Sequence, residues 1–254
     1  SRRSRLMPER KLSGLKTFSN RSYSPNALAW PSPVFIRTMF DGIAPDYDRF
    51  NAWASLGLHH RWRRDLVSRV PAGVRVLDLA TGTGDVALEC ASQGHEVCGV
   101  DFSDGMLMQA REKDVRRQIR WVKGSADRLP FSDRSFGAVT SAFVLRNIRH
   151  CLDAAFRENY RVLQKGGRAL HLDFGRPQPG FFGWAYRAHM HFGLSLIGQI
   201  TCGRRWPKQY LESSIQQFDD PVQVRARLAD AGFSRVSNTP MLWGVVQLYE
   251  GTKV

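Results

Sequence analysis

The feature that most constrains the fold is a short apolar strand that ends in a glycine-rich loop. Val74-Arg75-Val76-Leu77-Asp78-Leu79 is a short β-branched run, and Thr81-Gly82-Thr83-Gly84 follows it closely. Asp85–Gln93 then has the pattern of a helix that Gly94 ends. A second strand, His95–Asp101, finishes on an acid. This order predicts a nucleotide site, because glycines after a strand let a ligand approach the backbone beside a helix N-terminus.

The same alternation of strands and helices continues along the chain. The expected elements are a helix over 103–116, strands over 121–124 and 138–143, a helix over 152–163 ended by Gly166-Gly167, and a strand over 168–174. The runs 233–238 and 244–251 are typical of an antiparallel pair at a sheet edge. Strands that alternate with helices in this way predict an α/β fold with a doubly wound, mostly parallel sheet.

Composition excludes several classes of protein. The chain has 254 residues and 43% hydrophobic content, which is enough to bury a sizeable core. No apolar run approaches the roughly 18 residues that would indicate a membrane span. Four scattered cysteines form no CxxC pair, so we expect neither a disulfide framework nor a zinc site.

Charge is the unusual property of the composition. The chain has 37 basic and 23 acidic residues, and in its first 39 residues eight bases face only Glu9. Such a balance favours anionic partners, although an arginine-rich coding bias with a solvated surface remains the alternative. Residues 1–33 have the composition of a basic flexible arm or the remainder of a transit peptide. We therefore expect an organellar protein, on the matrix face of the mitochondrial inner membrane or in a plastid, with the membrane-associated bacterial cytoplasm as the alternative.

The glycine loop alone does not identify the ligand. Gly82-x-Gly84-x-x-Ala87 also fits the dinucleotide fingerprint. Asp78, which closes the first strand, and an acidic segment over 125–131 favour S-adenosylmethionine over a nicotinamide dinucleotide. Asp101 is placed to accept hydrogen bonds from both ribose hydroxyls.

Several segments resemble the ubiquinone/menaquinone biosynthesis C-methyltransferase family, whose members are class I S-adenosylmethionine-dependent methyltransferases. The most specific are Tyr47-Asp48-x-x-Asn51-x-x-x-Ser55-x-Gly57-x-His59-x-x-Trp62 and Leu145-Arg146-Asn147-Ile148. The other blocks are Leu77–Ala80 with Gly82–Asp85, Leu129–Phe131, Arg161–Leu163 with Gly166-Gly167, Leu172–Phe174 and, more loosely, Tyr210–Ile215. The similarity covers about residues 34–254. It implies a Rossmann-like methyltransferase domain with a helical cap inserted at about 174–215.

The resemblance also assigns roles to residues. It implies cofactor contacts from Thr83, Asp101, Ser125 and Ala126, with Asp78, Gly82 and Gly84 shaping the loop. The pattern departs from the family at Ala142-Phe143-Val144, where Ala142 replaces a serine, and at Gln164-Lys165, where the family has Lys-Pro before its glycine pair.

The implied chemistry is methylation of a ring carbon of a polyprenyl quinol. Such a carbon becomes nucleophilic when a ring hydroxyl ionises, and because a phenol has a pKa near 10, a nearby cation must favour the phenolate. Arg146 is the candidate for this cation, and Asn147 or Tyr47 would position the ring or a water. We interpret His59 as a structural residue, and His189 and His191 lack a third ligand for a metal.

Two functional hypotheses follow. The first is a quinone C-methyltransferase at an anionic membrane surface, in which the aromatic and basic segment between Phe174 and Tyr210 covers the substrate and contacts lipid. The second is a methyltransferase-like subunit of a larger assembly, with weak or no catalysis. A larger protein complex, a homodimer and RNA bound by the basic arm are the further partners to test.

Overall fold

The structure is a computed structural model that describes residues 31–175, 177 and 180–254. The expected basic arm over residues 1–33 therefore lies almost entirely outside the described residues. Several side chains in the segment 181–212 are also outside the description.

A seven-stranded sheet forms the centre of the fold, in the order β3-β2-β1-β4-β5-β7-β6. The strands are β1 (Val76–Leu79), β2 (Val97–Asp101), β3 (Ile119–Lys123), β4 (Phe136–Ala142), β5 (Leu163–Phe174), β6 (Ser234–Met241) and β7 (Val246–Thr252). The first five pair in parallel, and β7 runs antiparallel to both β5 and β6. The predicted doubly wound sheet with an antiparallel edge pair is thus confirmed.

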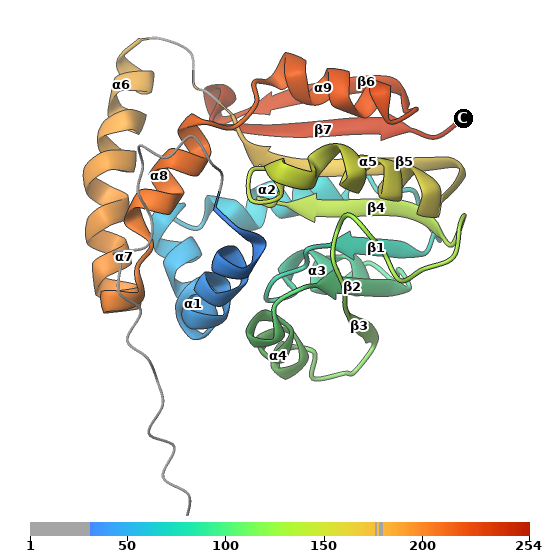
Figure 1. Cartoon of the computed structure of the whole chain (residues 1–254), viewed down its shortest axis with the longest axis horizontal. Helices are drawn as coiled ribbons and strands as arrows, with labels where there is room; N and C mark the ends of the chain where they lie inside the picture. The colour runs from blue at the N-terminus through green and yellow to red at the C-terminus, as the bar shows by residue number, and fades with distance from the viewer. Residues whose placement is uncertain (1–30, 176, 178–179) are drawn as a thin grey trace, which may run out of the picture.

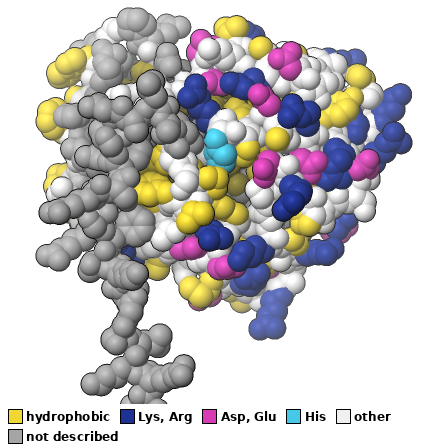
Figure 2. Space-filling model, viewed as in Figure 1, with side chains coloured by type: hydrophobic (Ala, Val, Ile, Leu, Met, Phe, Trp, Pro, Cys, Tyr) yellow, Lys and Arg dark blue, Asp and Glu magenta, His cyan; other side chains and the backbone are white. Residues whose placement is uncertain are grey.

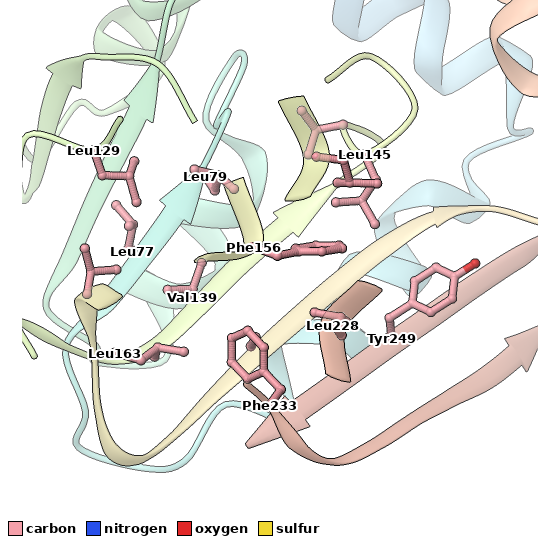
Figure 3. Close-up of a cluster of buried hydrophobic side chains, with 14 of the residues drawn as sticks. Leu77, Leu79, Leu129, Val139, Leu145, Phe156, Leu163, Leu228, Phe233 and Tyr249 are labelled. Atoms are coloured by element: carbon pink, nitrogen blue, oxygen red, sulfur yellow. The ribbon is translucent and has the colours of Figure 1, made fainter. Parts of the chain in front are cut away.

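Helices cover both faces of the sheet (Figure 1). One face carries α5 (Leu152–Val162) and α9 (Pro221–Asp230), and the other carries α2 (Leu58–Val67) and α3 (Asp85–Ser92), while α4 (Asp104–Lys113) packs beside β3. Side chains alternate across the strand β1. Leu77 and Leu79 join the core that contains Phe156 (Figure 3), whereas Val76 joins the core that contains Leu66.

The Gly166-Gly167 pair differs from its sequence-based expectation. It does not follow a helix, because α5 ends at Val162 and the strand β5 begins at the next residue. Gly166 has a φ of +79°, and its N–H donates to the carbonyl of Lys253 at 2.8 Å. Pairing with the end of the chain therefore decides the conformation here, and local helix-stop signals do not.

A long helix, α1 (Pro33–Ala54), and the cap helices α6 (Phe181–Ala188), α7 (Leu194–Cys202) and α8 (Lys208–Gln216) lie beyond the carboxyl ends of the parallel strands (Figure 1). The helix α1 begins with Pro33 after the N-cap Ser32, whose side chain accepts from the N–H of Phe35. The cap is joined to α1 by Arg205, which donates to the carbonyl of Gly42 at 2.9 Å.

The surface carries both charged and hydrophobic side chains. On the face seen in Figure 2, Lys and Arg side chains gather over the half of the molecule that contains the sheet, interspersed with acidic ones. Hydrophobic side chains are exposed between that half and the undescribed atoms. Among the helices that the structure describes, none combines the length and the apolar character needed to cross a membrane.

Candidate active site

The glycine loop joins β1 to α3 at the carboxyl edge of the sheet. Gly82 and Gly84 have φ values of +57° and +85°, a region that favours glycine. A Cβ at Gly84 would also lie 2.6 Å from the ring of Trp121, so a side chain there is excluded by packing as well. The loop is therefore fixed in a conformation that brings its backbone to the edge of a cavity, which Gly82 lines.

Asp101 ends β2 beside this loop and lines the same cavity. Its carboxylate accepts hydrogen bonds from the N–H groups of Gly82 at 2.8 Å and Ser103 at 2.9 Å. Burial raises the pKa of Asp101 to about 6, although these N–H donors oppose the rise. Each carboxylate oxygen keeps a second lone pair, so the group can still accept from the hydroxyls of a ribose.

Asp78 lies behind the loop and outside the residues that line the cavity. It accepts from the hydroxyls of Thr81 at 2.5 Å and Thr140 at 3.0 Å. Burial raises the pKa of Asp78 to about 7. These contacts are those of a residue that shapes the loop, the role that the sequence suggested for it.

Thr83 is placed differently from the contact expected of it. Its side chain is buried, with 2% of the residue exposed, and its hydroxyl donates to Asp48 of α1 at 2.6 Å. Lys113 of α4 also donates to Asp48, at 2.8 Å. Neither Thr83 nor Gly84 is among the residues that line the cavity. The hydroxyl of Thr83 is hydrogen-bonded to α1 in this structure. Its predicted contact with the cofactor stays a prediction.

Asp85, at the start of α3, connects the loop to two further helices. It forms ion pairs with Arg63 of α2 and with Lys113 of α4. Burial alone would raise the pKa of Asp85, but the two cations lower it below its ordinary value.

A second contact to α1 involves Asp41, which accepts from the hydroxyl of Ser103 at 2.5 Å. The helix α1 is therefore bonded to two loops beside this cavity, the glycine loop through Thr83 and the loop after β2 through Ser103.

Ser125 and Ala126 line the opposite side of the cavity, after β3. Ser125 is exposed, and its hydroxyl hydrogen-bonds to Asp127. Other lining residues were not singled out from the sequence, among them Phe102, directly after Asp101, and His150. Phe102 directly follows Asp101, the residue expected to bind the ribose, and this position is the sequence signal that could have identified it.

A second, larger cavity lies between α1, α2 and the cap helices, with a volume of about 470 Å³ against about 90 Å³ for the first. Its lining is mostly apolar and includes Phe50, Trp62, Leu194 and Trp206. The two cavities share four residues, which are Phe40, Tyr47, Phe143 and Asn147. The two cavities are therefore adjacent, with these four residues as their common wall.

Arg146 lines the larger cavity but not the smaller one. Its guanidinium donates to Asp173 at 3.0 Å and to the carbonyl of Phe143 at 2.7 Å, and lies over the ring of Phe174 at 5.0 Å. Burial raises the pKa of Asp173, and the positive charge of Arg146 opposes the rise. The pair carries no net charge when Asp173 is ionised.

Asn147 and Tyr47 stand on the common wall. The amide of Asn147 donates to the carbonyl of Phe143 at 3.2 Å and accepts from the hydroxyl of Tyr210 at 2.9 Å, so it is held on both sides. Tyr47 packs edge-on against Phe40, with ring centroids 6.1 Å apart. The structure thus brings the three predicted catalytic residues to one cavity.

His59 also lines the larger cavity. Its Nδ1 lies 2.7 Å from the hydroxyl of Ser55, one helical turn earlier. Burial, together with Arg63, lowers the pKa of His59 to about 4, so the ring is neutral at physiological pH. A base with so low a pKa is poorly matched to a phenol, in keeping with the structural interpretation.

The sequence of the chain matches the model of a known protein family. The model of the ubiE/COQ5 methyltransferase family matches residues 32–253. The chain belongs to this family. This membership confirms the predicted family and the predicted enzyme class, that of S-adenosylmethionine-dependent methyltransferases.

Two named methyltransferases have sequences similar to that of this chain. The chain is 40% identical over 221 residues to the demethylmenaquinone methyltransferase of Thermus thermophilus, a match that covers 85% of this chain and 100% of that protein. It is 36% identical over 227 residues to the ubiquinone/menaquinone biosynthesis C-methyltransferase UbiE of Azotobacter vinelandii, covering 86% and 89%. Both matches span nearly the whole relative.

Solved structures share the fold. A methyltransferase from Thermotoga maritima superposes with a TM-score of 0.60 at 19% identity, covering 85% of this chain and 99% of that one. Phosphoethanolamine N-methyltransferase 2 from Haemonchus contortus gives a TM-score of 0.62 at 18% identity, covering 88% and 61%. The predicted Rossmann-like class I methyltransferase fold is confirmed.

Proposed function

We propose that this chain transfers the methyl group of S-adenosylmethionine to a ring carbon of a polyprenyl quinol. The methyl transfer, the cofactor and the quinone class follow from the family and its named relatives. The structural observation that carries the proposal is the set of four shared lining residues, Phe40, Tyr47, Phe143 and Asn147, because it places the cavity of Asp101 and the glycine loop beside an apolar cavity.

The smaller cavity suits the cofactor. Asp101 offers a buried carboxylate to the ribose, and the open space at Gly82, where a Cβ would meet nothing within 4 Å, leaves the loop accessible. Phe102 and Ala126 provide apolar surface for the base. When bound, S-adenosylmethionine supplies an electrophilic methyl group, and the protein residues supply the binding and orientation.

The larger cavity suits the ring of the quinol. The mostly apolar walls exclude water, which strengthens every hydrogen bond made inside. Arg146 is placed to donate to a ring oxygen and so to favour the ionised form that makes the ring carbon nucleophilic. Asn147 and Tyr47, on the common wall, would orient the ring toward the methyl group, which is the geometric requirement of a direct transfer.

The prenyl tail requires an opening in the cavity. Leu56, in the turn between α1 and α2, lines the cavity and is 82% exposed, so this corner is a route to the surface. We place the tail exit here. On α7, Leu196 and Ile200 lie one turn apart and are also exposed. Apolar side chains of this kind favour peripheral contact with a membrane, where such a substrate resides.

We also propose a cellular location for this protein. The excess of basic residues, at +14 overall, favours an anionic membrane surface. The acid-poor first 33 residues favour an organellar protein, at the matrix face of the mitochondrial inner membrane.

Methyl transfer to short-tailed quinols tests the function. The full chain is mixed with S-adenosylmethionine carrying a labelled methyl group and a chemically reduced 2-prenyl-1,4-naphthoquinol or a 2-methoxy-6-prenyl-1,4-benzoquinol. We expect label on a ring carbon of at least one quinol and none on the oxidised quinones. A chain that binds the cofactor but methylates neither quinol would favour the alternative, a methyltransferase-like subunit of a larger assembly.

A further inference from the structure

Two loops orient the carboxylate of Asp101. Its Oδ2 accepts from the N–H of Gly82 at 2.8 Å, and its Oδ1 accepts from the N–H of Ser103 at 2.9 Å. Gly82 belongs to the glycine loop, and Ser103 belongs to the turn between β2 and α4. These two donors leave each oxygen one lone pair for a ligand. The direction in which Asp101 offers those lone pairs to a ribose therefore depends on the positions of both loops.

The helix α1 holds both of these loops. Asp48 accepts from the hydroxyl of Thr83 in the glycine loop at 2.6 Å, and Asp41 accepts from the hydroxyl of Ser103 at 2.5 Å. The two acids are about two helical turns apart, so they lie on one face of α1. Each of them bonds one of the loops that orient Asp101.

The contacts of Asp41 leave the turn after β2 little freedom. The same oxygen of Asp41 accepts from the N–H of Gly105 at 3.0 Å. The hydroxyl of Ser103, a fully buried residue, accepts in turn from the N–H of Met106 at 3.1 Å. A Cβ at Gly105 would lie 3.1 Å from the Cα of Asp41, so α1 and α4 meet closely at this point.

We propose that Asp41 is a positioning residue of the cofactor site, which holds Ser103 so that Ser103 in turn aims the carboxylate of Asp101 at the ribose. This inference rests on the proposed function and assigns a role to a residue that lines neither cavity. Because Asp41 is outside both linings, it acts on cofactor affinity through Ser103.

The charge of Asp41 gives this role a measurable signature. Burial raises the pKa of Asp101 to about 6, and the negative charge of Asp41 contributes to the rise. Two further charges near Asp101 are Lys123, its neighbour on β3, and Asp104 on α4, which pair with each other at 2.5 Å. The smaller cavity is also lined by the titratable side chains of Tyr47, His150 and Cys151. All of these stay in place when Asp41 is replaced, so a changed pH dependence reports on Asp41.

The test begins with the substitution Asp41→Asn. It keeps the shape of the side chain and leaves Ser103 with a neutral acceptor. The matched control is Asp46→Asn, because Asp46 lies in the same helix but pairs with Arg49 and Arg205. Ser103→Ala removes the link itself. Calorimetry at pH 8 gives the dissociation constant of S-adenosylmethionine for each variant, and a thermal melt checks that each is folded.

Asp41→Asn should raise the dissociation constant by about 3- to 10-fold, and Asp46→Asn should leave it unchanged. Ser103→Ala alone should raise it by at least as much. In the Ser103→Ala background, Asp41→Asn should add less than about twofold, because the two residues act as one unit. Equal factors in both backgrounds would overturn the inference, since Asp41 would then act without Ser103.

The pH dependence separates positioning of Asp101 from a general effect on the fold. Removal of a negative charge lowers the pKa of Asp101, so the loss of affinity in acid should begin at a lower pH in Asp41→Asn than in the unmutated chain. A purely structural role would weaken binding without moving this midpoint. An unmoved midpoint would therefore also overturn the inference.

If the unmutated chain binds no S-adenosylmethionine, the proposed function fails by itself. The inference is then decided without ligand, by NMR measurement of hydrogen exchange at the amide of Ser103, which donates to Asp101. Exchange should be faster in Asp41→Asn and unchanged in Asp46→Asn. Exchange that is the same in Asp41→Asn and the unmutated chain would refute the inference.

Discussion

The hydroxyl of Thr83, in the glycine loop, donates a hydrogen bond of 2.6 Å to Asp48 in α1. This contact ties α1 to the glycine loop, and both contribute residues to the lining of the smaller cavity. Lys113 reinforces it by donating to Asp48 at 2.8 Å while pairing with Asp85. The conformation of the loop therefore depends on a residue 35 positions earlier in the chain.

Replacing Asp48 with Asn should weaken cofactor binding. The change removes the charge that holds Lys113 and weakens the acceptor for Thr83, so the dissociation constant of S-adenosylmethionine should rise by about 2- to 10-fold. Asp46→Asn is the control, because Asp46 lies in the same helix but pairs with Arg49 and Arg205 on the cap side. Calorimetry that gives equal affinity for both variants would contradict the role of Asp48.

Cofactor affinity should decline in acid because of Asp101. The pKa of its carboxyl, about 6, lies above the ordinary value, and only the ionised form accepts from both ribose hydroxyls. Affinity should be constant above pH 7 and should fall by up to about tenfold per pH unit below pH 6. Asp101→Asn should bind weakly with no such pH dependence. Calorimetry between pH 5 and pH 8 checks both expectations, and a pH-dependent loss that persists in the variant would assign the titration to another group.

Replacing Arg146 with Ala should abolish turnover while S-adenosylmethionine still binds. Arg146 lines only the larger cavity, so in the proposed function its positive charge serves the quinol and acts mainly in the transition state. The substitution also leaves Asp173 buried without its cation, at a cost of about 3–5 kcal/mol in the free energy of unfolding. The double variant Arg146→Met/Asp173→Asn should recover that stability without recovering turnover. Turnover at the unmutated rate in either variant would exclude Arg146 from the chemistry.

Binding to lipid and to RNA should separate the two partner hypotheses. Anionic liposomes should sediment the full chain, and binding should weaken as salt screens the headgroups. Replacing both exposed residues, Leu196 and Ile200, with Ser should remove the part of the binding that salt does not affect. Removing residues 1–30 should reduce the salt-dependent part, because this deletion removes seven of the 37 basic residues. Preferential binding to structured RNA with a steep dependence on salt would instead support the ribonucleoprotein hypothesis.

Much of the sheet was predictable because its signals are local. Buried parallel strands show as short apolar runs, and turns between them show as glycines, so β1, β2 and the glycine loop were found within a few residues. The exception at Gly166-Gly167 arose because a contact with Lys253, at the far end of the chain, outweighs the local signal.

The candidate site was less accessible to sequence analysis because its contacts cross between elements. Residue type and position indicated Asp101 and Arg146, but not that Asp173 compensates the charge of Arg146. Nothing local marks Asp48 as the partner of Thr83.

The helix α1 supplies Phe40 and Tyr47 to the walls of both cavities. Ordering of these side chains by one ligand changes the surface that the other ligand meets. Thermodynamic linkage makes such an effect reciprocal, so any factor by which bound cofactor tightens quinol binding is the factor by which quinol tightens cofactor binding. Demethylated cofactor left after transfer would contact the same wall, so it too should change the affinity for the methylated product.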